Sequence, residues 1–87
     1  MNLFLLYVII DKMQHLSLGN YTREKRKATG KSLNKFAIEF DIESASLSRF
    51  ENNKQDIKFG MLVKVARGLG QTPSQFLADY ESSVNWH

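Results

Sequence analysis

Two histidines and three closely spaced serines are the side chains of this sequence best suited to acid–base or nucleophilic catalysis. His15 and His87 are far apart in the chain, and neither has a convincing carboxylate partner to orient its ring. Ser44, Ser46 and Ser48 have no histidine or lysine base beside them that could take a proton from the hydroxyl. The sequence therefore predicts that the protein is not an enzyme.

Sites for metals and phosphate-bearing cofactors are not indicated either. The chain has no cysteine, which excludes disulfides and thiolate metal sites. Its acidic residues do not show the spacing of a metal site, and there is no glycine-rich loop of the kind that holds phosphates. We expect no metal ion and no cofactor.

The basic side chains are clustered, although the net charge is only +3. The first group lies between residues 21 and 35 with Glu24 as its single acid, and consists of Arg23, Lys25, Arg26, Lys27, Lys31 and Lys35. A sparser second group consists of Arg49, Lys54, Lys58, Lys64 and Arg67. Such a basic face is either solvated or binds an anionic polymer or membrane surface, and charge alone does not decide between them.

The 87 residues are enough for one domain, and 43% hydrophobic with 24% charged residues is typical of a soluble globular protein. We expect an apolar N-terminal extension over residues 1–17, a folded domain over 18–81 and a C-terminal tail over 82–87.

The extension contains an unbroken apolar run, Leu3–Ile10. The run is shorter than the about 20 residues that cross a bilayer, and it lacks the features of a secretory signal. We therefore expect no membrane partner and a cytoplasmic location. Three interpretations remain open: the run pairs as a strand with the same segment of a second chain, packs on the domain, or is an upstream extension ahead of a start at Met13. We favour the first, a dimerisation arm, because an exposed apolar run would otherwise aggregate.

From residue 18 onward the apolar pattern predicts five short helices and no sheet. They are expected at Tyr21–Ala28, Leu33–Phe40, Glu43–Asn52, Phe59–Leu69 and from Pro73 onward. Gly19 and Asn20 are expected to interrupt the chain before the first helix. The apolar residues expected to face the core are Leu33, Phe36, Ala37, Phe40, Leu47, Phe50, Leu62, Val65, Ala66, Leu69, Phe76, Leu77 and Tyr80.

Local signals mark the ends of these helices. Gly30, Asn53 and Gly70 fit helix ends that need a left-handed residue. Ser32 is a favourable N-cap, and Thr72–Gln75 reads as a capping box with proline at the first helical position.

The second and third helices are joined only by Asp41 and Ile42, and helices linked so tightly cross steeply as a helix-turn-helix unit. From Tyr21 to Leu77 the sequence resembles the Cro/C1-type helix-turn-helix family of phage repressors, also called the XRE family. The matching residues are Arg26, Ser32–Ala37, Phe40–Ile42, Ala45–Lys54 and Leu62–Gly70. The resemblance implies an all-α, compact five-helix lambda-repressor-like domain.

The resemblance also implies roles for individual residues. Arg26 and Glu51 would form a structural ion pair that fixes the recognition helix to the scaffold. Base edges in the major groove would be contacted from Ser44, Ala45, Ser48 and Arg49. Arg49 is best suited to a specific contact, because a guanidinium can bond O6 and N7 of guanine together. The alternative for Arg49 is a surface arginine paired with an acid such as Asp56.

Phosphate contacts are expected from a second set of family positions and their neighbours, namely Lys31, Ser32, Lys35, Asn52, Asn53 and Lys54. Three residues depart from the family pattern. Leu33 replaces a phosphate-clamping glutamine, Asp41 replaces the usual glycine of the turn, and Glu43 replaces a serine or threonine cap.

These observations predict a sequence-specific DNA-binding transcriptional regulator, acting as a repressor and binding double-stranded DNA as a homodimer. The alternative from a different class is an antitoxin-like or other protein-interaction module that retains the fold and binds a partner such as a toxin.

Overall fold

The structure, a computed structural model, describes residues 17–84. Five helices follow one another in this part of the chain: α2 (Leu18–Ala28), α3 (Leu33–Glu39), α4 (Ser44–Glu51), α5 (Phe59–Gly68) and α6 (Pro73–Val84). No strand is present among the described residues, and the predicted all-α helix-turn-helix class is confirmed. The predicted dimerisation arm at Leu3–Ile10 lies outside the described residues.

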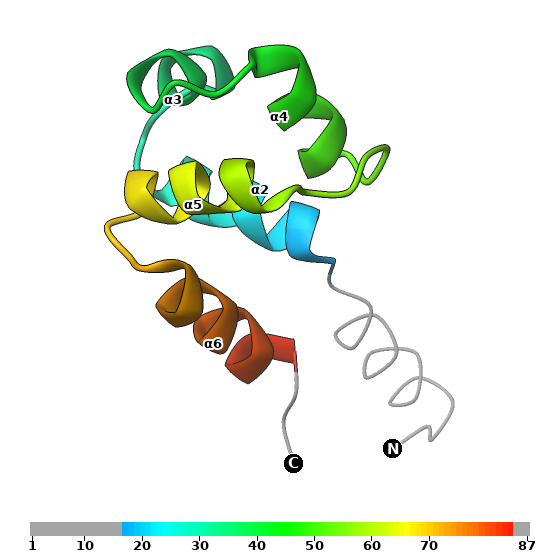
Figure 1. The fold of residues 1–87 in the computed structure, drawn as a ribbon, viewed down its shortest axis with the longest axis vertical. Helices are drawn as coiled ribbons and strands as arrows, with labels where there is room; N and C mark the ends of the chain where they lie inside the picture. Colours follow the sequence, from blue (N-terminus) through cyan, green and yellow to red (C-terminus); the bar gives the residue numbers. More distant parts are fainter. Residues whose placement is uncertain (1–16, 85–87) are drawn as a thin grey trace, which may run out of the picture.

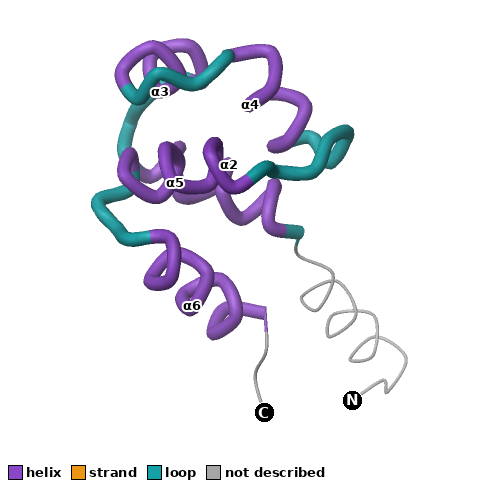
Figure 2. Tube along the Cα trace, in the orientation of Figure 1, coloured by secondary structure: helices purple, strands orange, loops and turns teal. Residues whose placement is uncertain are grey.

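The helices are arranged so that α3 and α4 lie together at one end of the molecule and α6 lies at the other, with α2 and α5 between them (Figure 1). Short loops connect consecutive helices (Figure 2). α4 packs against both α2 and α3, and α5 packs against α6. The helix that the sequence predicts as the reader is thus held by two others.

The core is built from one or two apolar residues of each helix together with Ile42 of the turn. The buried hydrophobic residues are Tyr21, Phe36, Ala37, Ile42, Leu47, Phe50, Val65, Ala66 and Phe76. Burying a large side chain of this kind contributes about 1.5–3 kcal/mol. Other predicted core residues, including Leu62 and Leu69, are only half-buried and pack around this centre. The rings of Phe76 and Tyr80 lie 5.8 and 5.4 Å from that of Tyr21, which joins α6 to α2.

The start of α2 differs from the prediction. The helix begins at Leu18, because Ser17 acts as its N-cap and its hydroxyl accepts a hydrogen bond from the Asn20 amide at 3.0 Å. Gly19 is therefore inside the helix. A Cβ atom at Gly19 would lie 2.1 Å from the carbonyl oxygen of Phe50, so this glycine permits the close approach of α2 to α4.

The end of α6 also differs from the prediction. The capping box forms as expected, with the Gln75 amide donating to the Thr72 hydroxyl at 3.2 Å and the Thr72 amide donating to the Gln75 side chain at 3.0 Å. The helix then continues to Val84, so residues 82–84 belong to it and not to a tail. The prediction failed because the polar residues Ser82 and Ser83 carry no apolar periodicity that would indicate a helix.

Candidate nucleic-acid interface

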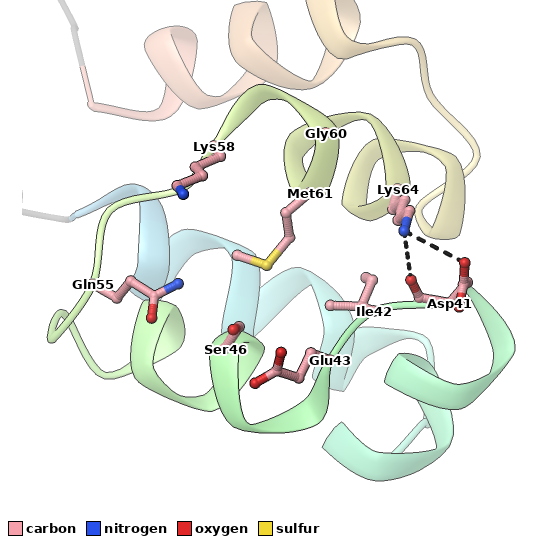
Figure 3. A pocket seen from close by; sticks show the side chains of 9 residues that line it. All are labelled: Asp41, Ile42, Glu43, Ser46, Gln55, Lys58, Gly60, Met61 and Lys64. Carbon is pink, nitrogen blue, oxygen red and sulfur yellow. Dashed lines mark hydrogen bonds and ion pairs between the residues drawn. The ribbon is translucent and has the colours of Figure 1, made fainter.

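The turn between α3 and α4 is shaped by Asp41. This residue has a φ of 57°, in the left-handed region that aspartate tolerates better than most residues. The Ile42 amide then donates to the Ala37 carbonyl at 2.8 Å, which closes the turn and buries Ile42. The Lys64 ammonium donates to the Asp41 carbonyl at 2.8 Å and lies 3.5 Å from its carboxylate (Figure 3). Lys64 thus offsets the negative charge of Asp41, the residue that stands in place of the usual glycine in this turn.

A buried ion pair fixes α4 to α2. The guanidinium of Arg26 donates to the two Glu51 carboxylate oxygens, from Nε at 2.9 Å and from a terminal nitrogen at 2.8 Å. Its other terminal nitrogen donates to the Lys31 carbonyl at 2.9 Å. These hydrogen bonds to Glu51 raise the pKa of Arg26 despite the opposing effect of burial. The two planar groups meet along a shared edge, so the pair fixes the orientation of α4 as well as its position.

The outer face of α4 carries the predicted base-contacting residues. Leu47 and Phe50 are buried, and at 100° per residue the opposite face holds Ala45 and Arg49, with Ser44 and Ser48 beside them. Ser44, Ala45 and Arg49 are exposed and Ser48 is half-buried. The arrangement therefore presents a short ridge of small side chains with one long cation.

Arg49 is held by neighbours whose contact with it was not predicted from the sequence. Its Nε donates to the Gln55 side-chain oxygen at 2.8 Å, and a terminal nitrogen donates to the Ser46 hydroxyl at 3.3 Å. The nearest carboxylate is that of Glu43, at 3.9 Å. The alternative of an ion pair with a nearby acid is therefore met by Glu43 and not by the suggested Asp56, because the loop after α4 brings Gln55 rather than Asp56 to the guanidinium.

The predicted phosphate contacts other than the two asparagines fall into two groups. Ser32, Lys35 and Lys54 are exposed, and the Ser32 hydroxyl caps α3 by accepting from the Lys35 amide at 3.1 Å. Lys31, in contrast, is paired with Glu39 at 2.9 Å and lies over the Phe40 ring. Its ammonium is therefore less available than the sequence suggested.

The two asparagines after α4 have structural partners. The Asn52 amide group donates to the Ser48 carbonyl at 2.8 Å, and that of Asn53 donates to the Asn20 side-chain oxygen at 3.2 Å. Asn53 also has the left-handed conformation expected of it, with a φ of 63°. Both residues shape the end of α4, Asn53 also ties it to α2, and each still exposes surface.

Metal binding and membrane insertion gain no support from this part of the chain. Within residues 17–84, no three His, Cys, Asp or Glu side chains come together as metal ligands. None of the helices described here is long and apolar enough to cross a membrane.

Comparison with known proteins places the chain in a family. No family model and no solved structure matches it. Over 67 residues it is 33% identical to a protein of Mycoplasma sp named Control protein C.MunI, and the aligned region covers 76% of this chain and 90% of that protein. With this relationship and its five-helix fold, the chain belongs to the family of Control protein C.MunI.

Proposed function

We propose that the chain is a sequence-specific, Cro/C1-type DNA-binding regulator that inserts α4 into the major groove of double-stranded DNA. The observation that carries this proposal is the exposed ridge of α4, backed by the buried pair of Arg26 and Glu51. Small side chains at Ser44, Ala45 and Ser48 let the helix approach base edges closely. Arg49 supplies the long donor that can bond a guanine.

Phosphate contacts would fix α4 in the groove. Lys35, near the start of α3, and Lys54, in the loop after α4, are exposed cations. Contacts of this kind supply affinity and register without reading sequence. Glu43 at the start of α4 opposes them, because its carboxylate is 72% exposed close to the proposed groove face.

We propose that the regulator acts as a homodimer and represses transcription. α4 has eight residues, so it spans about 12 Å, or about three to four base pairs. So short a reading helix specifies few bases, and two copies on a two-fold site about 34 Å apart would double the number read. The segment Leu3–Ile10 stays our predicted dimerisation arm, and the cytoplasm our predicted location.

Selection of bound duplexes from a random pool tests the proposed function. We expect one enriched motif containing a guanine, and loss of preference for that motif in Arg49→Ala with the melting temperature nearly unchanged. Arg67→Ala is a matched control, since Arg67 is an exposed arginine on α5, away from the α4 ridge. Equal binding of selected and scrambled duplexes by the wild type would contradict the proposal. A chain that binds no duplex at low salt would favour the alternative, an antitoxin-like module with a protein partner.

A further inference from the structure

Arg49 is the one predicted base-reading side chain long enough to adopt many conformations, yet its position is defined by two hydrogen bonds. Gln55, in the loop after α4, accepts from its Nε at 2.8 Å, and Ser46 accepts from a terminal nitrogen at 3.3 Å. Gln55 and Ser46 both line the pocket between α4 and α5. Figure 3 shows Ser46 on α4 and Gln55 on the loop that follows this helix. The guanidinium is thus anchored at the α5 side of the ridge.

The loop that carries Gln55 is itself fixed to α4. The left-handed Asn53 turns the chain, and the Lys54 amide donates to the Arg49 carbonyl at 2.8 Å. The backbone of Lys54 is therefore hydrogen-bonded to Arg49. The next residue, Gln55, holds the Arg49 side chain. Gln55 is also half-buried, so its side chain has less freedom than one on the open surface.

The hydrogen bonds leave a specific edge of the guanidinium available. Its five N–H groups are one on Nε and two on each terminal nitrogen. Gln55 takes the Nε proton and Ser46 takes one proton of a terminal nitrogen. Both terminal nitrogens therefore keep protons, and their shared end is an edge that can bond O6 and N7 of one guanine.

We infer that Gln55 is a positioning residue for specificity, which holds Arg49 so that the end of its guanidinium meets a guanine. This inference rests on the proposed function. Holding the side chain in advance lowers the conformational cost of ordering it on DNA. It also opposes Glu43, whose carboxylate lies 3.9 Å from the guanidinium and would draw it towards the start of α4 if Gln55 released it. A glutamine does this without adding a negative charge beside the phosphates.

The test compares Gln55→Met, Arg49→Ala and the double variant on the selected duplex and a scrambled duplex at one salt concentration. Methionine keeps the length of glutamine and removes the acceptor. We expect Gln55→Met to lose about 3- to 10-fold in affinity for the selected duplex and less than about twofold for the scrambled one. In the Arg49→Ala background, Gln55→Met should have no further effect, because it acts through the guanidinium.

Gln71→Met is the matched control. Gln71 lies in the loop between α5 and α6 and bonds Asp79 on the surface, so the same substitution breaks a similar contact away from α4. We expect its preference to equal that of the wild type. Single replacements of guanine by 7-deazaguanine, which lacks N7, should weaken wild-type binding at one position of each half-site.

Four results would overturn the inference. An equal loss on both duplexes, or a further loss in the Arg49→Ala background, would mean that Gln55 acts through folding or touches DNA itself. No 7-deazaguanine effect would exclude end-on pairing with guanine. An unchanged preference in Gln55→Met would mean that Arg49 needs no support. A wild type that binds both duplexes equally would instead reject the proposed function, and this inference with it.

Discussion

Two arginines of this chain have opposite roles, and their surroundings decide which is which. Arg26 is buried and satisfied by Glu51 and a backbone carbonyl, so its charge serves the fold. Arg49 is exposed, bonds two neutral acceptors that leave donors available and lies 3.9 Å from the exposed Glu43 carboxylate, so its charge can still serve a ligand. The difference arises because α4 turns Glu51 inward towards α2 and Arg49 outward. Because the pKa of Arg26 is raised, the contribution of its charge to folding stability is complete below the ordinary pKa of arginine. That contribution is lost only as pH rises through the raised value.

Glu51→Ala tests the structural pair. It leaves a buried guanidinium without its carboxylate, so we expect the free energy of unfolding to fall by about 3–5 kcal/mol in urea denaturation. Replacing both partners, as Arg26→Met with Glu51→Leu, should cost less, because no charge stays buried. Glu39→Ala is the surface control. It breaks the pair between Lys31 and the Glu39 carboxylate, which is 45% exposed, and should cost at most about 1 kcal/mol. A loss in Glu51→Ala no larger than that of the control would contradict the assigned role.

The helix α5 has one glycine near each end, and the two glycines have different surroundings. A Cβ atom at Gly68 would lie 2.4 Å from the Phe36 ring and 2.9 Å from that of Phe40, so the glycine lets α5 approach α3. A Cβ atom at Gly60 would meet nothing within 4 Å. Helix propensity alone treats both glycines as equally costly, and only the packing separates them.

Alanine at each of these positions should therefore change stability in opposite directions. Gly60→Ala should stabilise the protein by up to about 1 kcal/mol, since alanine loses less backbone entropy in a helix. Gly68→Ala should destabilise it by about 1–3 kcal/mol, because the buried Phe36 ring has to shift. Thermal unfolding of the two variants is the measurement. A stabilised Gly68→Ala variant would contradict the close contact of α5 with the Phe36 ring of α3.

Features set by neighbouring residues were predictable from the local sequence pattern, and features set by distant ones were not, apart from the Arg26–Glu51 pair that the family resemblance implied. The caps at Ser32 and Thr72 and the left-handed Asn53 are local, and each agrees with its prediction. The role of Gly19 depends on the backbone of Phe50 in another helix. The local sequence shows only a glycine, which predicted a break before the helix. The contact of Lys64 with Asp41 joins residues that only the fold brings together.

The site followed the same division. The spacing of Leu47 and Phe50 was enough to place Ala45 and Arg49 on the opposite face of α4, with Ser44 and Ser48 beside them. Gln55 was missed because nothing in its neighbourhood marks it as a partner of Arg49. Its position depends on how the loop folds back over the last turn of α4.

For the whole molecule, the distribution of cations sets the salt dependence of DNA binding. Lys35 and Lys54 are exposed, whereas Lys31 is engaged by Glu39 and Phe40. We expect Lys35→Gln and Lys54→Gln each to lower by about 1 the slope of log affinity against log salt, with equal losses on selected and scrambled duplexes. Lys31→Gln should change the slope less. Slopes equal to that of the wild type in Lys35→Gln and Lys54→Gln would mean that these two ammonium groups do not contact phosphates.

The size of the reading helix sets the last expectation. One α4 covers about three to four base pairs, which is too few to define a site in a genome, so the selected motif should be a pair of inverted half-sites about one helical turn apart. Sedimentation should then give two chains per duplex. Removal of residues 1–12 should yield a monomer that binds one half-site weakly, if the Leu3–Ile10 arm joins the two copies. A truncated chain that stays dimeric would place the interface on the helical domain, where Phe59 is 68% exposed at the start of α5 and Phe59→Ser becomes the next variant to sediment.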